Sequence, residues 1–436
     1  MTAYLTGLAA CLQELFTSTA DYLGRLTGFI QRQRHLTAAQ FAQTLVFRWL
    51  AKPRTTLEAL ARELGLSPQA LQQRLTPAAQ AFLLALLRQA LQRALQVRPE
   101  RLGLLDRFRV VVVEDTTVVP LPPALAEAFP GCGGGSGAGE GAAALKVLLR
   151  WDVRSGQLLA LSVHAGRTSD QELAASAADL PDGALHLADQ GFFSSQRWQA
   201  FGPQQFWISR VPARTLVHWR GRWQPLAALL AGTAAAQLAE AVLLVEQVAL
   251  PCRLLARRCP AEVAHRRRQK LRAYTRDKKG REPSAAQLAL GDWLVFATNT
   301  TAEQLGPQEV WVVYRCRWQI ELLFKRAKSL AGWGGSLGRT PGRVLVELYA
   351  KLLGLVVLHW GSLLGGGPLN GVSLWKRWAE VQDFGRRLQD SLTQGAQAVA
   401  AVLRQLARQL ARIRPEPKRQ KKASTRQLLL NPQLAP

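Results

Sequence analysis

Three carboxylates occupy positions from which they could carry metal-dependent chemistry. Asp115 lies at the end of a β-branched run, Asp189 follows the short segment LHLA, and Glu321 lies in a segment with helical periodicity. Strand ends and a facing helix can bring acids that are distant in sequence into one cluster. Three neighbouring acids repel one another unless a cation neutralises them. Magnesium prefers oxygen ligands and suits phosphate chemistry, so the three acids predict a magnesium site for phosphoryl transfer.

Such a site commonly holds two ions. Two Mg²⁺ ions about 3.5–4 Å apart would activate a water or a 3′-hydroxyl and stabilise the leaving oxygen, and Mn²⁺ could replace them. Each acid taken alone has a simpler interpretation. Asp115 could cap a turn or helix, and Glu114 and Asp170 are the nearest rival carboxylates among 30 Asp and Glu residues.

The segment around Glu321 places basic residues beside the acid. Steps of three, four and seven residues put Tyr314, Arg317, Glu321 and Lys328 on roughly one face of a helix. A surface ladder of ion pairs is the alternative. Apolar residues leave little room for a wholly solvated helix; they are Trp318, Ile320, Leu322 and Phe324. The combination fits an acid that holds metal and cations that hold the phosphates on which the metal acts.

The pattern Tyr-x2-Arg-x3-Glu-x6-Lys resembles the signature of the insertion-sequence-four family of bacterial DDE transposases, and EDTT around Asp115 and ADQGF around Asp189 look like its two Asp motifs. The resemblance covers about residues 105–335. The long gap before Glu321 is similar to members that carry a β-rich insertion there. One departure is Gln190, where a basic residue is common in the family.

The resemblance implies roles for individual residues. Asp115, Asp189 and Glu321 would be the catalytic metal ligands of a cut-and-paste transposase. A second group would bind DNA near the cleavage site, with Tyr314 on a terminal phosphate; it comprises Tyr314, Arg317, Trp318, Lys325 and Lys328.

Trp293 has two interpretations. In hairpin-forming members of the family, a Trp that opens an apolar strand upstream of the Glu motif stacks on a flipped base. Trp293 opens WLVFATN in the corresponding place. An aromatic face can offset part of the few kcal/mol that base extrusion costs. The alternative is a core Trp within a strand.

The order of elements predicts an α/β fold. Three strands, a helix, a strand, a helix and a strand follow one another in the order of a ribonuclease-H-like core. We expect a mostly β insertion domain to interrupt that catalytic core, with helical N-terminal and C-terminal regions on either side. The expected divisions are a helical DNA-binding region 1–104, the core 105–210, the insertion 211–300, the core continued with the Glu helix 301–338, helices 339–412 and a disordered basic tail 413–436.

Residues 55–75 have the pattern of a helix-turn-helix. Small Ala61 lies four residues before Gly65, which would make the tight turn, while Ser67 would cap the next helix and Pro68 fits its first turn. The second helix would then enter the major groove of DNA. An ordinary helical hairpin is the alternative.

Two further segments have unusual composition. The Gly-rich segment 130–141 lacks the Gly-Lys-Ser/Thr ending of a phosphate-binding loop, so it indicates a flexible connection. Residues 266–281 hold nine Lys or Arg in 16 residues, which predicts either a solvated loop or a sequence-independent contact with the DNA backbone. A helix is expected at 170–178 and a long helix at 303–331.

The composition indicates which kind of partner and which cell compartment to expect. The formal net charge of +26 favours polyanions such as nucleic acid. The apolar stretch 344–358 is interrupted by Glu347 and Lys351, which favours a buried helix over a membrane span. No basic residue precedes Arg25, so no secretory signal is expected. The five cysteines form no CxxC pair and the six histidines show no metal-ligand spacing, which favours reduced thiols in a bacterial cytoplasm, at the nucleoid.

Together these features predict a homodimeric transposase that acts on DNA, both transposon ends with terminal inverted repeats and target DNA. The late helices are the natural candidates for a dimer interface. One alternative is a nuclease or junction resolvase with the same core, which would cut DNA without joining it. The other is a non-catalytic DNA-binding regulator.

Overall fold

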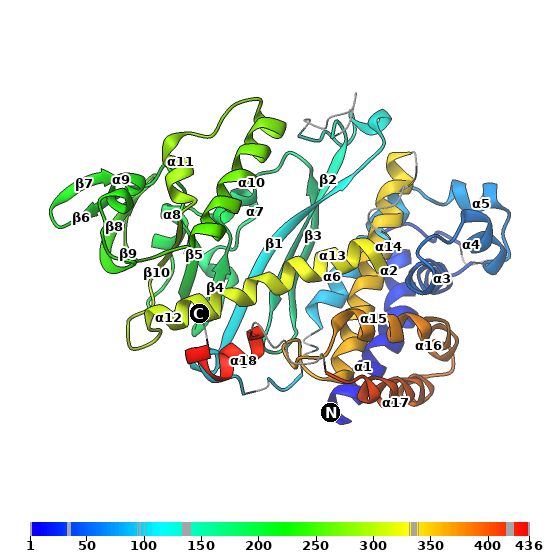
Figure 1. Ribbon diagram of the computed structural model, residues 1–436. Coiled ribbons are helices and arrows are strands. Elements are labelled where there is room, and N and C mark those ends of the chain that lie inside the picture. Colours follow the sequence, from blue (N-terminus) through cyan, green and yellow to red (C-terminus); the bar gives the residue numbers. More distant parts are fainter. Residues whose placement is uncertain are drawn as a thin grey trace.

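The computed structural model describes residues 2–32, 36–93, 95, 97–99, 101–132, 141–330, 332, 338, 340–415 and 423–434. Within them, ten strands form one mixed sheet in the order β3-β2-β1-β4-β5-β10-β9-β8-β6-β7. Helices pack on the sheet, and an all-helical body lies at its β3 end (Figure 1). The expected α/β fold with helical regions at both ends of the chain is confirmed. The Gly-rich segment lies largely outside the described residues.

The strands nearest the site are short and strongly apolar. β1 pairs antiparallel with β2 and parallel with β4, β4 pairs parallel with β5, and β5 pairs antiparallel with β10. The bounds of the ten strands are β1 Val110–Pro120, β2 Ala144–Asp152, β3 Leu158–Ala165, β4 Ala184–Ala188, β5 Phe206–Arg210, β6 Leu216–Trp219, β7 Arg222–Pro225, β8 Gln237–Val245, β9 Ala249–Arg258 and β10 Trp293–Thr298.

The helical body is built from both ends of the chain. α1 packs on α17, and α3 and α6 pack on α14. Its helices are α1 Thr2–Glu14, α2 Ala20–Leu26, α3 Ala38–Ala51, α4 Leu57–Glu63, α5 Pro68–Gln73, α6 Pro77–Gln92, α14 Pro341–Ser362, α15 Leu374–Asp383, α16 Gly385–Leu392 and α17 Ala396–Arg412. The helices that accompany the sheet are α7 Asp170–Leu173, α8 Ser195–Gln199, α9 Leu226–Ala231, α10 Ala261–Lys279, α11 Ala285–Leu290, α12 Pro307–Tyr314 and α13 Trp318–Leu330.

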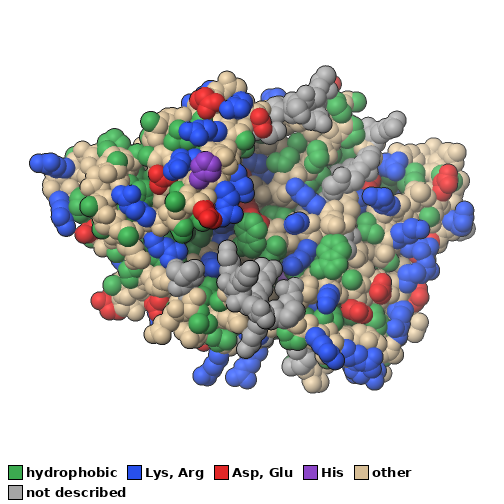
Figure 2. Space-filling view, in the orientation of Figure 1, with side chains coloured by type: hydrophobic (Ala, Val, Ile, Leu, Met, Phe, Trp, Pro, Cys, Tyr) green, Lys and Arg blue, Asp and Glu red, His purple; other side chains and the backbone are tan. Residues whose placement is uncertain are grey.

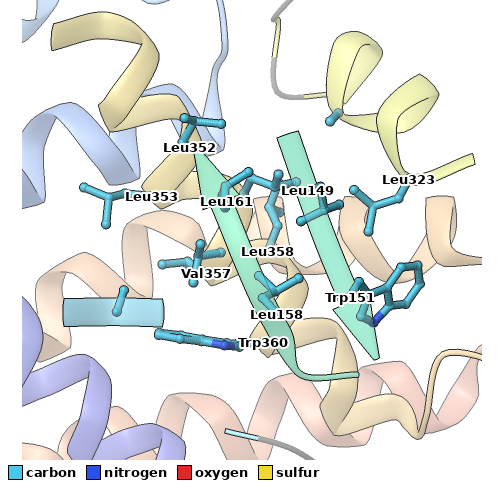
Figure 3. Close-up of a cluster of buried hydrophobic side chains, with 14 of the residues drawn as sticks. Leu149, Trp151, Leu158, Leu161, Leu323, Leu352, Leu353, Val357, Leu358 and Trp360 are labelled. Carbon is cyan, nitrogen blue, oxygen red and sulfur yellow. The ribbon is translucent and has the colours of Figure 1, made fainter. Parts of the chain in front are cut away.

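The most apolar helix, α14, joins the helical body to the sheet. By length and composition it could cross a membrane, yet 94% of its most apolar 18-residue stretch is buried inside the protein. Figure 3 shows its leucines and Trp360 against side chains of β2 and β3, with Leu323 of α13 beside Leu149. Glu347 and Lys351 form a buried ion pair of 2.9 Å. The expected buried helix is confirmed.

The residues expected to form a helix-turn-helix do fold as two short helices, α4 and α5. Gly65 has a φ of +65° and so makes the turn without steric strain. The Ser67 hydroxyl accepts the Ala70 N–H at 3.1 Å, and Pro68 occupies the first turn of α5. Contact between α5 and DNA remains a prediction.

The expectation of a mostly β segment at 211–300 is wrong, because three helices lie among its strands. The basic run is largely α10, a 19-residue helix, instead of a solvated loop. Its sequence is rich in Arg, Lys and Ala, which favour helix, and contains neither Gly nor Pro before Gly280 ends it at a φ of +58°. The strands β6 to β10 extend the same sheet as β1 to β5.

Three smaller expectations also need correction. The long helix at 303–331 begins only at Pro307, and a 3-10 turn at Arg315–Arg317 separates α12 from α13. The helix expected at 170–178 is two short pieces, because Ala174 is extended. The basic tail contains α18 (Thr425–Leu430), whose Leu428 and Leu429 are buried. Residues 416–422 of that tail lie outside the described residues.

A buried ionic cluster surrounds Glu114 of β1. The Glu114 carboxylate accepts the Ala175 N–H at 3.0 Å and forms ion pairs of 3.0 Å with Arg150 and 3.2 Å with Arg197. His186 Nε2 lies 3.2 Å from Glu114 Oε1, without hydrogen-bond geometry. Burial alone would raise the pKa of Glu114, but His186, Arg150 and Arg197 outweigh it and lower the pKa to about 2.

We expect Glu114→Gln to lower the free energy of unfolding by about 3–5 kcal/mol at pH 7, because two buried arginines lose their counter-charge. The pKa of Glu114 is about 2 in the folded protein and about 4.3 when unfolded, so its stabilisation is complete above about pH 4.5 and is lost toward pH 2. Urea unfolding at pH 7 and pH 3 should therefore show the gap between wild type and variant shrinking in acid. The exposed Glu127→Gln is the matched control. A gap that stays constant with pH would contradict this account.

Candidate active site

The register of the parallel strands β1 and β4 brings two of the three acids to one face of the sheet. Val113 of β1 pairs with Leu187 of β4. Asp115 and Asp189 each lie two residues beyond this pair. Since side chains two residues apart in a strand point to the same face, both carboxylates lie on that face, on neighbouring strands. Glu114, one residue earlier, points to the opposite face.

The third acid comes from α13, which packs on this face of β1 (Figure 1). Its inward residues Ile320, Leu323 and Ala327 are at most 1% exposed. They recur at helical spacing, so the helix has a fixed rotation above the sheet. Glu321 follows Ile320, and its side chain is 31% exposed at the border between core and solvent.

Arg317 lies among the three acids. Its Nη1 is 3.7 Å from Asp115 Oδ2, and its Nη2 donates a hydrogen bond to Glu321 Oε1. Burial disfavours the charged guanidinium, but Tyr314, Asp189 and Glu321 outweigh this effect and raise the pKa of Arg317. The side chain is therefore a permanent cation within the acidic cluster.

The electrostatics confirm that the acids are close enough to interact. Burial raises the pKa of Asp115 to about 7, while Arg317 and the Thr116 N–H act to lower it. The charges of Asp189 and Glu321 add to the rise. Three acids that share one buried region in this way favour a cation.

Tyr314 and Arg210 border Asp189. The Tyr314 hydroxyl donates a hydrogen bond to the Ala188 carbonyl at 3.0 Å and lies 3.5 Å from Asp189 Oδ1. Burial raises the pKa of Tyr314 above its ordinary value. Arg210 Nη1 lies 4.0 Å from Asp189 Oδ1. Sequence reasoning missed Arg210, although it ends the strand next to β4 and therefore obeys the same strand-end rule as Asp189.

The two rival acids are placed differently from the three. Glu114 is enclosed on the opposite face. Asp170 lies at the edge of the site, where it accepts hydrogen bonds from Thr116 Oγ1 at 2.7 Å and Lys146 Nζ at 3.0 Å. Asp170 is thus already neutralised by a lysine, while Asp115 and Glu321 share Arg317 and Asp189 lies 4.0 Å from Arg210.

The donor set suits a hard divalent cation, because it consists of carboxylate oxygens on the rim of a sheet. Among the described residues, no three His, Cys, Asp or Glu side chains are grouped closely enough to share an ion. The Arg317 guanidinium reaches both Asp115 and Glu321. A cation would therefore compete with Arg317 for the same oxygens.

Two residues of α13, Trp318 and Lys325, face outward beside the acids. Trp318 is 55% exposed and Lys325 is exposed, and the seven-residue step between them places both on one face. Lys328 is half-buried, and burial lowers its pKa. Figure 2 shows the face of the molecule hollowed between α13 and α10, with Lys and Arg side chains around the hollow.

Trp293 does not join this group. It is 4% exposed and packs in a core with Trp207, Val295 and Ala297, while its strand neighbour Phe296 packs against Tyr314 on the side of the acids. The Arg258 guanidinium covers the indole at 4.6 Å from the ring centroid. Of the two interpretations of Trp293, the core residue describes this structure. None of the five cysteines is paired in a disulfide.

Comparison with known proteins identifies relatives over nearly the whole chain. A family described as the transposase DDE domain matches residues 106–357. The transposase for insertion sequence element IS231E of Bacillus thuringiensis subsp. finitimus is 22% identical, covering 90% of this chain and 88% of its own. The transposase for IS231C of subsp. berliner is 25% identical, covering 79% and 77%. The putative transposase InsL for IS186A of Escherichia coli (strain K12) is 28% identical over 187 residues, covering 39% and 48%.

The two tryptophans should differ in what they contribute to stability. We expect Trp293→Ala to lower the free energy of unfolding by about 3–5 kcal/mol, because it empties a packed core. Trp318→Ala should change it by less than about 0.5 kcal/mol, because the indole is mostly in solvent. Urea unfolding monitored by circular dichroism measures both. Equal losses of unfolding free energy would contradict a buried Trp293 and an exposed Trp318.

Proposed function

Because the chain belongs to the DDE transposase family, we propose that Asp115, Asp189 and Glu321 are the three carboxylates with which it cuts and joins DNA. The family acts on DNA at transposon ends and generally uses a divalent metal. One observation carries the assignment: of the acids near the site, these three lie on one face of the sheet around Arg317, with Arg210 4.0 Å from Asp189. Glu114 and Asp170 each have their own partners.

The three acids would hold Mg²⁺, two ions per site, and Mn²⁺ could replace it. The bound metal would activate the attacking oxygen and stabilise the leaving oxygen of an in-line displacement. The protein's own side chains would position the DNA at the site. Lys325 and Lys328 face the same side of α13 and would hold phosphates beside Glu321, and Trp318 would lie against the DNA.

The proposed course is cut-and-paste transposition. Water attacks one strand at the transposon end and releases a 3′-hydroxyl. That hydroxyl attacks the opposite strand and forms a hairpin, which water reopens. The freed 3′-end then attacks target DNA. Each step breaks one phosphodiester P–O bond and forms another P–O bond, so one set of carboxylates suffices throughout.

We also propose a role for each region of the chain around the site. β1 to β5 with α13 would form a ribonuclease-H-like core, and β6 to β9 with α9 to α11 an insertion carried by β5 and β10. α4 and α5 would read the terminal repeat, and the helices at 339–412 would form the dimer that pairs two ends. We propose that the chain belongs to the insertion-sequence-four group and works in the bacterial cytoplasm at the nucleoid.

A role for Arg317 follows from its place among the acids. In the metal-free protein its guanidinium supplies the counter-charge that the three carboxylates need. When metal takes over that charge, the guanidinium is free to turn to a DNA phosphate, for which its planar fork of donors is well suited. Binding of metal and grip on DNA would in this way be coupled through one side chain.

The acids should be indispensable for the chemistry and dispensable for binding. We expect Asp189→Asn and Glu321→Gln each to lower cleavage of a cognate end in Mg²⁺ by at least about 1,000-fold, or about 4 kcal/mol of transition-state stabilisation. DNA binding should persist, since binding rests on basic residues. The exposed Asp383→Asn is the control.

The same assay separates the rival functions. A nuclease or resolvase would cleave but never join a 3′-end to target DNA. A non-catalytic regulator would bind DNA and be indifferent to either acid substitution. Cleavage that survives Glu321→Gln would reject the assignment of the carboxylates.

Arg317 should compete with metal, and this can be measured without DNA. We expect Arg317→Gln to lower the thermal midpoint in EDTA, because three acids lose their counter-charge, and to enlarge the rise in midpoint that Mg²⁺ or Mn²⁺ produces. Asp189→Asn should reduce that rise. Arg62→Gln, at an exposed site far from the acids, serves as the control. A metal-induced rise that is smaller in Arg317→Gln than in wild type would contradict the competition.

A further inference from the structure

A short segment near the C-terminus packs against the elements that lead to the acids. Residues 423–434, here called the C-terminal strap, comprise α18 and a 3-10 turn at Pro432–Leu434. The strap packs on α12 and on the 3-10 turn at Gly103–Arg107, and Figure 1 shows α18 in red beside α12. The helix that precedes it in the chain, α17, belongs to the helical body. The strap therefore leaves that body and covers part of the catalytic region.

The leucines of the strap divide into a buried and an exposed pair. Leu428 and Leu429 are each 1% exposed, whereas Leu430 and Leu434 are 54% and 52% exposed. The backbone of the strap also comes close to the turn that it covers, since a Cβ atom at Gly103 would lie 3.0 Å from the Leu429 carbonyl oxygen. The buried pair therefore anchors the strap, and the exposed pair offers a matched comparison within the same segment.

The turn under the strap leads directly into β1. Arg107 ends this turn, and β1 begins at Val110 and carries Asp115. The Arg107 guanidinium donates hydrogen bonds to the Gln304 carbonyl at 2.7 Å and to the two Glu309 carboxylate oxygens at 2.7 and 2.9 Å. Glu309 lies in the first turn of α12. The turn before β1 and the start of α12 are therefore joined, and the strap packs on both.

The helix α12 is covered all round near its C-terminal end. The consecutive residues Val310 to Tyr314 are all buried, and such a run points around the whole circumference of a helix. The Phe296 ring of β10 covers one side, with its centroid 4.9 Å from that of Trp311 and 4.2 Å from that of Tyr314. The strap supplies cover away from the sheet. From Tyr314 the chain continues through one 3-10 turn into α13, so a shift of α12 would move Glu321 with it.

The strap is also attached to the helical body. Arg426 Nη1 donates a hydrogen bond to the Asn370 carbonyl at 2.6 Å. Asn370 lies in the connection between α14 and α15. The strap thus bridges three parts of the chain that are distant in sequence: the helical body, the turn before β1 and α12.

We propose that the C-terminal strap positions the acids, because Leu428 and Leu429 hold the turn before β1 against α12 and so fix the spacing between Asp115 and Glu321. The inference rests on the proposed function for the reaction that this spacing serves. It adds that cleavage requires a docked strap, and that the strap is a separable part which a peptide can replace. Misplacing catalytic groups by about 1 Å can cost about 100-fold in rate, so undocking should be visible in catalysis.

The test undocks the strap in the full-length protein with the double variant Leu428→Asp/Leu429→Asp, since two carboxylates are unfavourable in an apolar contact. We expect cleavage of a cognate end in Mg²⁺ to fall about 100-fold while affinity for duplex DNA stays unchanged. Leu430→Asp/Leu434→Asp adds the same charge to the exposed pair and should cut like wild type. A synthetic peptide of residues 423–436 should restore cleavage to the undocked variant, and the same peptide with both aspartates should not.

Hydrogen exchange in the metal-free protein separates positioning from general stability. Undocking should speed exchange in α12 and in the turn at 103–107 at least about tenfold and leave α3 of the helical body unchanged. Equal acceleration in α3 would overturn the proposal, as would cleavage by the undocked variant at the wild-type rate or failure of the peptide to restore it. If wild type itself cuts no cognate end, the proposed function falls. The exchange pattern would then still decide whether the strap holds α12, because it requires neither DNA nor metal.

Discussion

The pleat of β1 is the constraint on which the site depends. Glu114 and Asp115 are consecutive, so one faces each side of the sheet, and Asp115 can face the site only while Glu114 is buried on the other side. A lone buried carboxylate is very unfavourable. The protein meets this cost with Arg150 from β2, His186 from β4 and Arg197 from α8. A one-residue slip of β1 would put Glu114 among the acids and Asp115 against two arginines, so the buried cluster also fixes the register.

The two faces of β1 differ in how far their carboxylates are compensated by cations. Behind the sheet, Glu114 has two arginines and a histidine, and its pKa falls to about 2. In front, three acids face two arginines, Arg317 and Arg210, and burial raises the pKa of Asp115 to about 7. The front is therefore short of positive charge, and the back is fully compensated. That asymmetry is what distinguishes a structural ion cluster from a site that can accept a cation and a polyanion.

Much of this arrangement could be predicted from the sequence, because it depends on short-range rules. Strand alternation and helical spacing bring Asp115, Asp189 and Glu321 together once β1 and β4 are neighbours, and the buried run of β1 is visible in its composition. Other features could not be predicted locally. Whether Trp293 faces the acids or the core depends on the pairing of β10 with β5 and β9, which joins residues far apart in sequence. The helix α10 could have been predicted, because its residues favour helix and include neither Gly nor Pro.

The position of β10 decides how the segment 211–300 relates to the acids. Because β10 lies between β5 and β9, the segment returns beside β5 after β6 to β9 have extended the same sheet. Its helices α10 and α11 are therefore held at the edge where Asp189 follows β4, and α13 covers the other side of that edge. Asp189 is the one carboxylate that both sides reach, with Arg317 and Tyr314 on the α13 side and Tyr274 and Arg281 on the α10 side. Asp189 therefore lies between a buried cation, Arg317, and an exposed ring, Tyr274. The α10 side of Asp189 is tied to β5 and β10, which flank the segment, and the α13 side is tied to β1, on which α13 packs.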